Sequence, residues 1–483
     1  MSQQLTSAPK IGATQEEILQ NILAQVEPVD FKELTAKVNK RKLNLRERDT
    51  IVLVIEWLYK YAKLSGTMFG RADGYNYLYV GTHWQAIQDE QVFCSFLSRF
   101  ALKMGVDFTD ARYWGFRQSL LEQFSAVAPS IRADVKHASI NLQNGTFVFG
   151  QGGGLRKHSA RDGFAYLLPF GYDPDAACPV FDGYLKKVLP DEACRNIIAE
   201  YIGSIFVPSS ELKLEKVLLL YGGGSNGKSV LFEVVNALLG ATNITSFSLR
   251  QLTDGTGYYR ARFSDKLLNY SSEISRDLDT TLFKQLASGE PVDARSPYGK
   301  PFIMRNYGKM MFNCNELPAD VEHTNGFFRR FLIVPFNVTI SEQEQDKSLT
   351  KRIIHSELAG VFNWMLRGME RLLKQGDFTQ SAIIAEQLNQ YRIESDSVKL
   401  FLQEQYYVSC DRTYVLLGSL YQEYKSFCEQ GGYKPVNLKN FRKRLTDSGT
   451  DMTRHSAGGY KVYLRQNLPV QEMPIVEPDM KLF

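Results

Sequence analysis

Long apolar runs and paired cysteines are both missing from this sequence, and each absence excludes a class of protein. No stretch approaches the ~18 consecutive apolar residues that a membrane-spanning helix needs. The first ten residues, MSQQLTSAPK, are too polar for a secretory signal. The six cysteines are scattered without a C-x-x-C pair, which argues against a zinc site or a disulfide framework and predicts lone packed thiols. We therefore expect a cytoplasmic protein that does not contact a membrane.

The net charge of +4 is too small to indicate a polyanionic partner for the chain as a whole. The basic excess is concentrated in residues 396–465, which carry eleven Lys and Arg against seven Asp and Glu. A local surplus of this kind is typical of a nucleic-acid surface. Asp173 and Asp175 could be read as metal ligands, but both flank Pro174 in a turn sequence, so we favour a structural role for them.

A strand, a glycine loop and a helix follow one another between residues 217 and 240. The apolar run VLLLY leads into GGGSNGKS, which matches G-x-x-x-x-G-K-[ST] at every fixed position, and an amphipathic segment follows it. Glycines let the backbone curl so that N–H groups point at phosphate oxygens near the positive end of the helix. The alternative is a glycine-rich turn with a chance Lys-Ser, which the flanking strand and helix disfavour.

This loop predicts a site for ATP and Mg²⁺. Lys228 would reach the β- and γ-phosphates, and the Ser229 hydroxyl would bind Mg²⁺. The predicted nucleotide-binding residues are Gly222, Gly223, Gly224, Ser225, Asn226, Gly227, Lys228 and Ser229.

Hydrolysis also needs a carboxylate and a sensor of the γ-phosphate, which can be sought at the ends of later strands. A short apolar strand ends at Glu273, which we expect to polarise the attacking water and to help bind Mg²⁺. An ordinary exposed glutamate at a strand end is the alternative. The strand 309–313 leads to Asn315, which we prefer to Asn313 as the sensor, although both could simply build the turn that follows.

Arg329 and Arg330 precede the apolar strand 331–334 and follow a turn. A guanidinium pair in this position suits an arginine finger that stabilises the charge on a nucleotide held by a neighbouring subunit. That role would require a ring of subunits. A basic surface pair without function is the alternative.

These segments together resemble the superfamily III helicases, specifically the phage and plasmid primase-helicase group related to poxvirus primase-helicases. The resemblance is carried by GGGSNGKS, LLNYSSEIS, LFKQLASGEPVDARSPYGKPF, FNCNELP and GFFRRFLIVPF, and by NLQNGTFVFG and GYDPDAACPVFDGYLKKVLP upstream. It implies an AAA+ type core that forms a homohexameric ring and translocates on DNA.

The resemblance also implies that residues 284–302 form a hairpin in the central channel of the ring. Arg295, Tyr298 and Lys300 would then touch single-stranded DNA, since strand tracking needs positive charge beside an aromatic platform. A hairpin that only packs against its neighbour is the alternative. Little more than 200 residues precede the loop, and they contain no persuasive primase motif, so a separate primase or loader is the expected partner.

Residues 396–465 read as two helices, a basic helix and a two-stranded wing, an order that resembles a winged helix-turn-helix. Lys439, Arg442, Lys443 and Arg444 lie on or beside the candidate recognition helix, which implies double-stranded DNA, such as an origin, as the ligand. Many winged helices bind protein instead, and that alternative stays open.

The expected fold class is α/β, with a P-loop core around a parallel sheet, an α+β N-terminal region and a C-terminal winged helix. The function expected is a replicative DNA helicase; a nucleotide-switched DNA-binding initiator and a packaging or loader ATPase without unwinding are the alternatives. The expected domains are an N-terminal helical region (1–70), an α+β lead-in domain (71–178), a helical collar (179–211), the core (212–340), a helical extension (341–390), the winged helix (391–470) and a tail (471–483).

Overall fold

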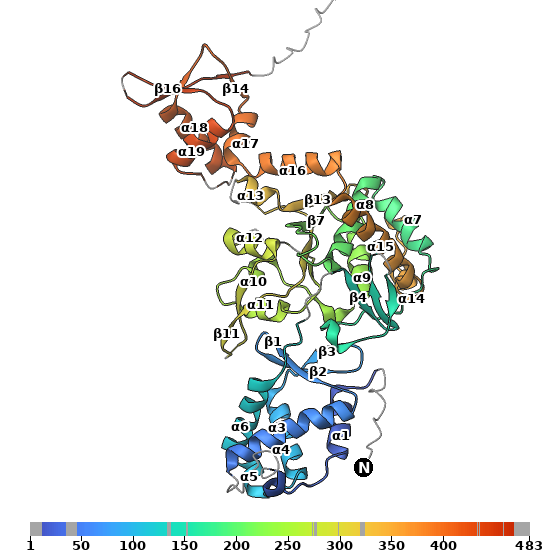
Figure 1. The fold of residues 1–483 in the computed structure, drawn as a ribbon. Coiled ribbons are helices and arrows are strands. Elements are labelled where there is room, and N and C mark those ends of the chain that lie inside the picture. The colour runs from blue at the N-terminus through green and yellow to red at the C-terminus, as the bar shows by residue number, and fades with distance from the viewer. Residues whose placement is uncertain are drawn as a thin grey trace, which may run out of the picture. The chain divides into compact units, whose positions relative to one another are not determined.

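The computed structural model describes residues 12–34, 46–132, 137–150, 153–272, 274, 278–297, 299–318, 324–431, 433, 435–456 and 458–467. The chain divides into two compact units (Figure 1). The first unit comprises residues 1–316 and 330–381, and the second comprises residues 317–329 and 382–483. Within the described residues, no helix is both long enough and apolar enough to cross a membrane.

The first unit begins with a helical region whose side chains share one hydrophobic core. That core runs from Ile18 to Phe124 and contains a cluster of packed phenylalanine rings. The predicted boundary at residue 70 therefore falls inside this core. Its elements are α1 (Gln15–Ala24), α3 (Glu47–Leu64), α4 (Glu90–Lys103), α5 (Phe108–Arg112), α6 (Trp114–Val127) and the antiparallel strands β1 (Phe69–Ala72), β2 (Tyr75–Tyr79) and β3 (Trp84–Ala86).

A small antiparallel sheet and two helices lead into the core. Leu142 of β4 (Ser139–Leu142) pairs with Gly145 of β5 (Gly145–Val148), which confirms the expected hairpin but places its turn at residues 143–144, one residue earlier than Asn144-Gly145. Strand β6 (Gly154–Arg156) pairs with β5. Helices α7 (Pro179–Val188) and α8 (Glu192–Gly203) are separated at Pro190, because proline cannot continue a helix. The split predicted from the sequence is confirmed.

The centre of the first unit is a parallel sheet of five strands in the order β13-β7-β12-β9-β8. Strands such as VLLLY and FLIVP are almost wholly apolar, as expected where helices cover both faces of a sheet. The strands are β7 (Val217–Tyr221), β8 (Ile244–Thr245), β9 (Leu268–Ser271), β12 (Lys309–Cys314) and β13 (Phe331–Pro335). The predicted α/β class with a parallel sheet is confirmed.

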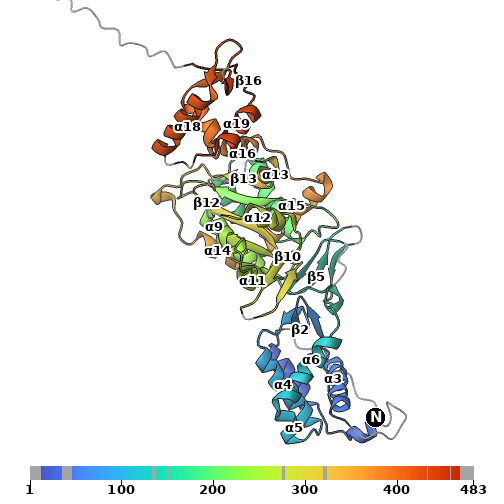
Figure 2. The same cartoon turned by 90° about the vertical axis from the view of Figure 1, so that its left-hand side faces the viewer.

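Helices pack on two sides of this sheet, which Figures 1 and 2 show from two directions. Helix α15 packs against α8 and α9, and α14 packs against α9. The helices are α9 (Lys228–Leu239), α10 (Leu249–Leu252), α11 (Tyr258–Phe263), α12 (Thr280–Ser288), α14 (Leu349–Ser356) and α15 (Leu358–Gln375). A separate hairpin is formed by β10 (Val292–Arg295) and β11 (Pro301–Met304).

The second unit has its own core, in which Phe401, Tyr424 and Phe441 pack together. Three helices and a β16–β17 hairpin lie where the sequence predicted helices and a wing, and three short strands were not predicted. The elements are α13 (Asn325–Phe328), α16 (Ala382–Glu394), α17 (Ser397–Glu404), β14 (Tyr407–Ser409), β15 (Val415–Leu416), α18 (Leu417–Gly431), α19 (Leu438–Asp447), β16 (Met452–Arg454), β17 (Tyr460–Val462) and β18 (Leu464–Gln466).

Candidate functional site: a phosphate cradle and basic surfaces

The glycine loop joins the carboxyl end of β7 to the amino end of α9, and it is tightly curled. Gly224, Ser225 and Gly227 have φ angles of 112°, 45° and 84°. A side chain on Gly222 would not fit, because its Cβ would lie 2.4 Å from Asn226 Nδ2 and 2.5 Å from the carbonyl oxygen of Phe336. Gly222 is therefore required because other atoms approach it closely, and Gly224 and Gly227 are favoured because their backbone is left-handed.

The loop offers unpaired backbone donors. In the described part of the chain, the amide N–H groups of residues 223–227 have no acceptor. A Cβ on Gly223 or Gly224 would meet no atom within 4 Å, so this side of the loop is open. Orphan amides at the positive end of a helix form an anion site, and the residues present therefore fit a nucleotide phosphate.

Lys228 lies inside this curl. Its Nζ donates to the carbonyl oxygen of Gly222 at 2.6 Å and to Oδ1 of Asn226 at 3.1 Å, and its side chain is buried. Burial lowers the pKa of the Lys228 amine. Asn226 is held in turn, because its Nδ2 donates to the carbonyl oxygen of Phe336 at 3.1 Å. The amine is thus held within the loop by two of the loop's own oxygens.

Two contacts that the sequence did not predict fix the shape of the loop. The Tyr184 hydroxyl of α7 donates to the carbonyl oxygen of Gly227 at 2.7 Å, and the Ile340 N–H donates to the carbonyl oxygen of Ser225 at 2.7 Å. Tyr184 is buried, and burial raises its pKa, so the hydroxyl stays protonated as a donor. Nothing in a local motif marks a tyrosine 43 residues upstream as a loop support.

The neighbouring strand β12 brings Asn315 to the start of the cradle. Cys314 is level with Tyr221 in the sheet, and its carbonyl oxygen accepts from the Gly222 N–H at 3.1 Å. Asn315 follows directly and is exposed, whereas Asn313 is buried and accepts a hydrogen bond of 2.9 Å from the Tyr270 hydroxyl. Of the two asparagines, Asn315 is therefore the one whose amide is open to a ligand. Glu273 lies outside the described residues.

Arg329 and Arg330 have different surroundings. Arg330 is buried, and its Nη2 donates to Ser288 Oγ at 2.9 Å and lies 3.6 Å from Glu215 Oε2. Its carbonyl oxygen accepts from the Val217 N–H, at the end of β7 opposite the cradle. Arg329 is exposed. The contacts of Arg330 fit a structural role, so Arg329 is the better candidate for reaching another subunit.

The β10–β11 hairpin overlaps the segment 284–302 to which the resemblance assigned a hairpin, although residues 284–288 belong to α12. Arg295 lies opposite Pro301, and the Gly299 N–H donates to the Ser296 carbonyl oxygen at 2.9 Å at the tip. The side chains of Arg295 and Lys300 are exposed, and Tyr298 lies outside the described residues. The hairpin also has an intramolecular neighbour. The ring of Tyr75 in β2 packs edge-on against Phe302 at 6.0 Å, and its hydroxyl bonds to that of Ser296.

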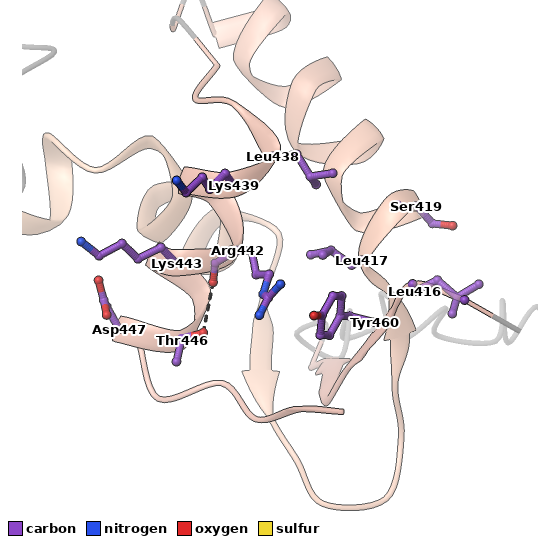
Figure 3. Close-up of a pocket in the computed structure, with 13 residues that line it drawn as sticks. Leu416, Leu417, Ser419, Leu438, Lys439, Arg442, Lys443, Thr446, Asp447 and Tyr460 are labelled. Carbon is purple, nitrogen blue, oxygen red and sulfur yellow. Dashed lines mark hydrogen bonds between the residues drawn. The ribbon is translucent and has the colours of Figure 1, made fainter. Parts of the chain in front are cut away.

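In the second unit, the exposed face of α19 lines a groove of about 1120 Å³ (Figure 3). Lys439, Arg442 and Lys443 contribute the positive charge, and the Arg442 guanidinium lies 4.0 Å from the centre of the Tyr460 ring. Arg444 does not join them. It donates to the buried Asp396 at 3.0 Å, so its prediction as a DNA contact is not supported by its position.

The remaining sequence predictions concern polar groups outside the cradle. The Asp175 N–H bonds to Asp173 Oδ1 at 3.0 Å, which supports the turn interpretation of this acidic doublet. Among the described residues, no group of three or more His, Cys, Asp or Glu side chains could hold a metal ion. All six cysteines are free thiols, four of them buried, as predicted.

Two family models match parts of the chain. Residues 220–330, which include the cradle and the hairpin, match a family of unknown function, DUF5906. Residues 393–461, which include α19, match the Poxvirus D5 protein-like family.

Two viral proteins named as helicases are similar to parts of this chain. A protein of Acanthamoeba polyphaga mimivirus bears the name helicase L207/L206. It is 25% identical over 236 residues, which are 45% of this chain and 24% of that protein. The protein named as helicase 121R of Invertebrate iridescent virus 3 is 24% identical over 310 residues, 55% of this chain and 32% of its own length. The chain spans about a quarter to a third of these relatives.

A solved structure, the apo A form of the NrS-1 C-terminal region, is 12% identical and covers 84% of this chain and 98% of its own, with a TM-score of 0.45. A likeness of this size does not locate a site.

Proposed function

We propose that this chain, which is related to the phage and viral primase-helicases, is an ATP-dependent replicative DNA helicase of a phage, plasmid or other mobile element. The observation that carries the proposal is the cradle: five consecutive amides without acceptors in the described part of the chain, curled around the buried amine of Lys228. The viral relatives carry helicase names, and ATP hydrolysis at the cradle would supply the energy for strand separation.

The cradle residues have distinct tasks in this proposal. The amides of residues 223–227 bind the phosphate chain of ATP, while Lys228 exchanges the Gly222 carbonyl for the β- and γ-phosphate oxygens. Tyr184 and Asn226 hold the loop in its curled form before ATP arrives, so little ordering entropy is lost on binding.

Mg²⁺ would be held by Ser229, the second residue of α9, together with Glu273. Bound there, the ion would neutralise charge on the phosphates during transfer. Glu273 would also orient the attacking water, and Asn315 would hydrogen-bond the γ-phosphate from the end of β12.

Subunit contact would complete the site. Arg330 lies at the sheet end opposite the cradle, roughly 20 Å away at about 3.3 Å per strand residue, so its side chain does not serve the nucleotide of its own chain. We infer a homohexameric ring in which the exposed Arg329 reaches the neighbour's nucleotide. The AAA+ arrangement and the ring both belong to this proposal.

DNA would be contacted at two places. Arg295 and Lys300 on the hairpin would follow the backbone of a single strand in the channel, and Lys439, Arg442 and Lys443 on the winged helix would contact a duplex. Contacts of cations with phosphates are independent of base sequence, so translocation would not depend on sequence, whereas an origin preference would require base contacts by α19.

One observation favours a second candidate, a nucleotide-switched DNA-binding initiator that does not unwind DNA. Ser296 and Phe302 of the hairpin contact Tyr75 in the same chain, which anchors the hairpin on its own N-terminal sheet. An anchored hairpin suits a static clamp better than a moving tracker.

A forked-duplex assay with ATP, run beside native mass measurement, decides between these functions. If the chain is a helicase, it separates the strands, and its native mass is that of a hexamer. Strand separation must also stop in the Lys228→Ala variant. ATP-dependent DNA binding without strand separation would refute the helicase proposal and support the initiator.

A further inference from the structure

The groove on the second unit is lined by apolar as well as basic side chains, and a DNA backbone would contact only the basic ones. Its walls are α19, the start of α18 and the turn before β17 (Figure 3). Leu416 and Leu438 line it and are 44% and 45% exposed, which is high for large aliphatic side chains. Leu417 and Tyr460 extend the apolar lining. An exposed apolar surface inside a concave groove is typical of a site for a protein segment.

Charge surrounds this apolar floor. Three cations and one carboxylate line the groove, Lys439, Arg442, Lys443 and Asp447, which gives a net charge of +2. Figure 3 shows Lys439, Lys443 and Asp447 on one side of the groove and the Leu416 and Leu417 side chains on the other. The Arg442 guanidinium lies against the Tyr460 ring, so the charged and apolar parts meet in the middle. A ligand that satisfies both parts must be acidic and apolar at once.

A segment with this composition follows the same domain. Residues 468–483, LPVQEMPIVEPDMKLF, lie outside the described part of the chain. They contain Glu472, Glu477 and Asp479 against Lys481, a net charge of −2, interleaved with eight Leu, Val, Ile, Met and Phe residues and three prolines. The charge of the segment is equal and opposite to that of the groove.

The segment is also long enough to reach. It follows Asn467, whose N–H donates to the carbonyl oxygen of Tyr406 at 2.8 Å beside the β14–β18 pair. Sixteen residues span up to roughly 50 Å when extended. A domain of about 70 residues has a radius of gyration of only about 11 Å. Any point on the surface of the domain is therefore within range of the segment.

We propose that residues 468–483 dock in the groove of their own chain, with their apolar side chains on Leu416 and Leu438 and their carboxylates on Lys439, Arg442 and Lys443. A docked segment covers the face of α19 that the proposed function assigns to duplex DNA. The segment then acts as a built-in competitor that DNA must displace. Docking itself does not depend on the proposed function, whereas the competition with DNA rests on it.

The full chain tests the docking directly. A photo-crosslinking amino acid at position 438 should capture residues 468–483 of the same molecule, detected as a linked peptide by mass spectrometry. The same amino acid at Ile383, which is equally exposed at 43% but does not line the groove, is the matched control. Capture by another protein copy, or no capture of residues 468–483, would overturn the proposal.

A binding measurement provides the second test. A fluorescent peptide of residues 468–483 is titrated into the chain shortened after Asn467, followed by anisotropy, with circular dichroism to check folding. Reversing two rim charges, Lys439→Glu with Lys443→Glu, should weaken binding at least tenfold, and so should a peptide with Glu472→Gln, Glu477→Gln and Asp479→Asn. Equal binding by the charge-reversed protein would refute docking at this groove.

Duplex binding distinguishes docking from its consequence. The shortened chain should bind a short duplex several-fold more tightly than the full chain, and added peptide should reverse the gain. If the peptide binds and is crosslinked but duplex affinity does not change, docking stands and the assignment of α19 to duplex DNA is wrong.

Discussion

Removing the Tyr184 hydroxyl should weaken nucleotide binding, although this side chain lies outside the glycine motif. Its hydroxyl donates to the Gly227 carbonyl oxygen at 2.7 Å, at the residue where the loop turns with a φ of 84° into α9. A Tyr184→Phe substitution keeps the buried ring and deletes only the donor. The loop then loses the hydrogen bond that ties its Gly227 carbonyl oxygen to α7, and the curled form becomes one of several conformations.

The size of the effect follows from the geometry. A neutral hydrogen bond contributes about 1 kcal/mol to stability, and a buried acceptor left without a partner costs ~1–3 kcal/mol. The Gly227 oxygen also accepts from the Val230 N–H at 3.0 Å, so the substitution does not leave it without a partner, and the lower figure applies. A penalty of about 1 kcal/mol on the binding-competent loop corresponds to roughly a fivefold rise in the Kd for ATP.

Tyr201→Phe is the matched control. The Tyr201 hydroxyl is also buried and also donates to a backbone carbonyl, that of Met310 at 2.5 Å, but within the sheet rather than at the loop. Both variants should lose a few degrees in Tm, whereas only Tyr184→Phe should bind a fluorescent ATP analogue more weakly. Unchanged affinity in Tyr184→Phe, or an equal loss in Tyr201→Phe, would refute the support role.

The remaining predictions concern four other positions. Lys228→Ala should reduce ATP hydrolysis at least a hundredfold with an unchanged circular dichroism spectrum, because the γ-phosphate loses its amine; an active variant would contradict the site. Arg329→Ala should lose hydrolysis and regain it on mixing with Lys228→Ala subunits. Arg330→Ala should lower Tm instead, because it removes a buried guanidinium that bonds to Ser288 and lies near the half-buried Glu215. Burial lowers the pKa of His83 to about 4. The unfolded chain binds that proton more readily, so stability should fall as pH drops from about 6.5 to about 4, and His83→Gln should reduce the fall in thermal melts.

The cradle could be predicted from the sequence because its constraints are local. Glycines at fixed offsets, a preceding apolar strand and a following amphipathic segment are all contained in 24 residues, 217–240. The hairpin near Asn144 was equally local, whereas a hairpin in residues 284–302 was expected only from the family resemblance. What the sequence could not provide was the order of the strands. The neighbours of β7 are the strands beginning at Lys309 and Phe331, about a hundred residues later, and long-range packing decides such pairings.

Side-chain assignments were harder to predict where two residues of one type adjoin. Arg329 and Arg330 are indistinguishable by type, yet one is exposed and the other is bonded to Ser288. Arg442 and Arg444 differ in the same way, because helical geometry turns residue 444 away from the face shared by residues 439, 442 and 443 and toward Asp396. Tyr184 carried no signal at all, because its partner is a backbone oxygen.

The bond between Arg330 and Ser288 joins the arginine that precedes β13 to the end of α12. Ser288 is the last residue of α12, and β10 begins four residues later, so this helix end is the root of the hairpin. Arg330 adjoins the arginine assigned to the neighbour's phosphate. If Arg329 shifts during hydrolysis in the neighbouring subunit, Arg330 and Ser288 would transmit that shift to the start of the β10–β11 hairpin in the same chain. Hydrolysis in one subunit would in this way advance the DNA contacts of the next.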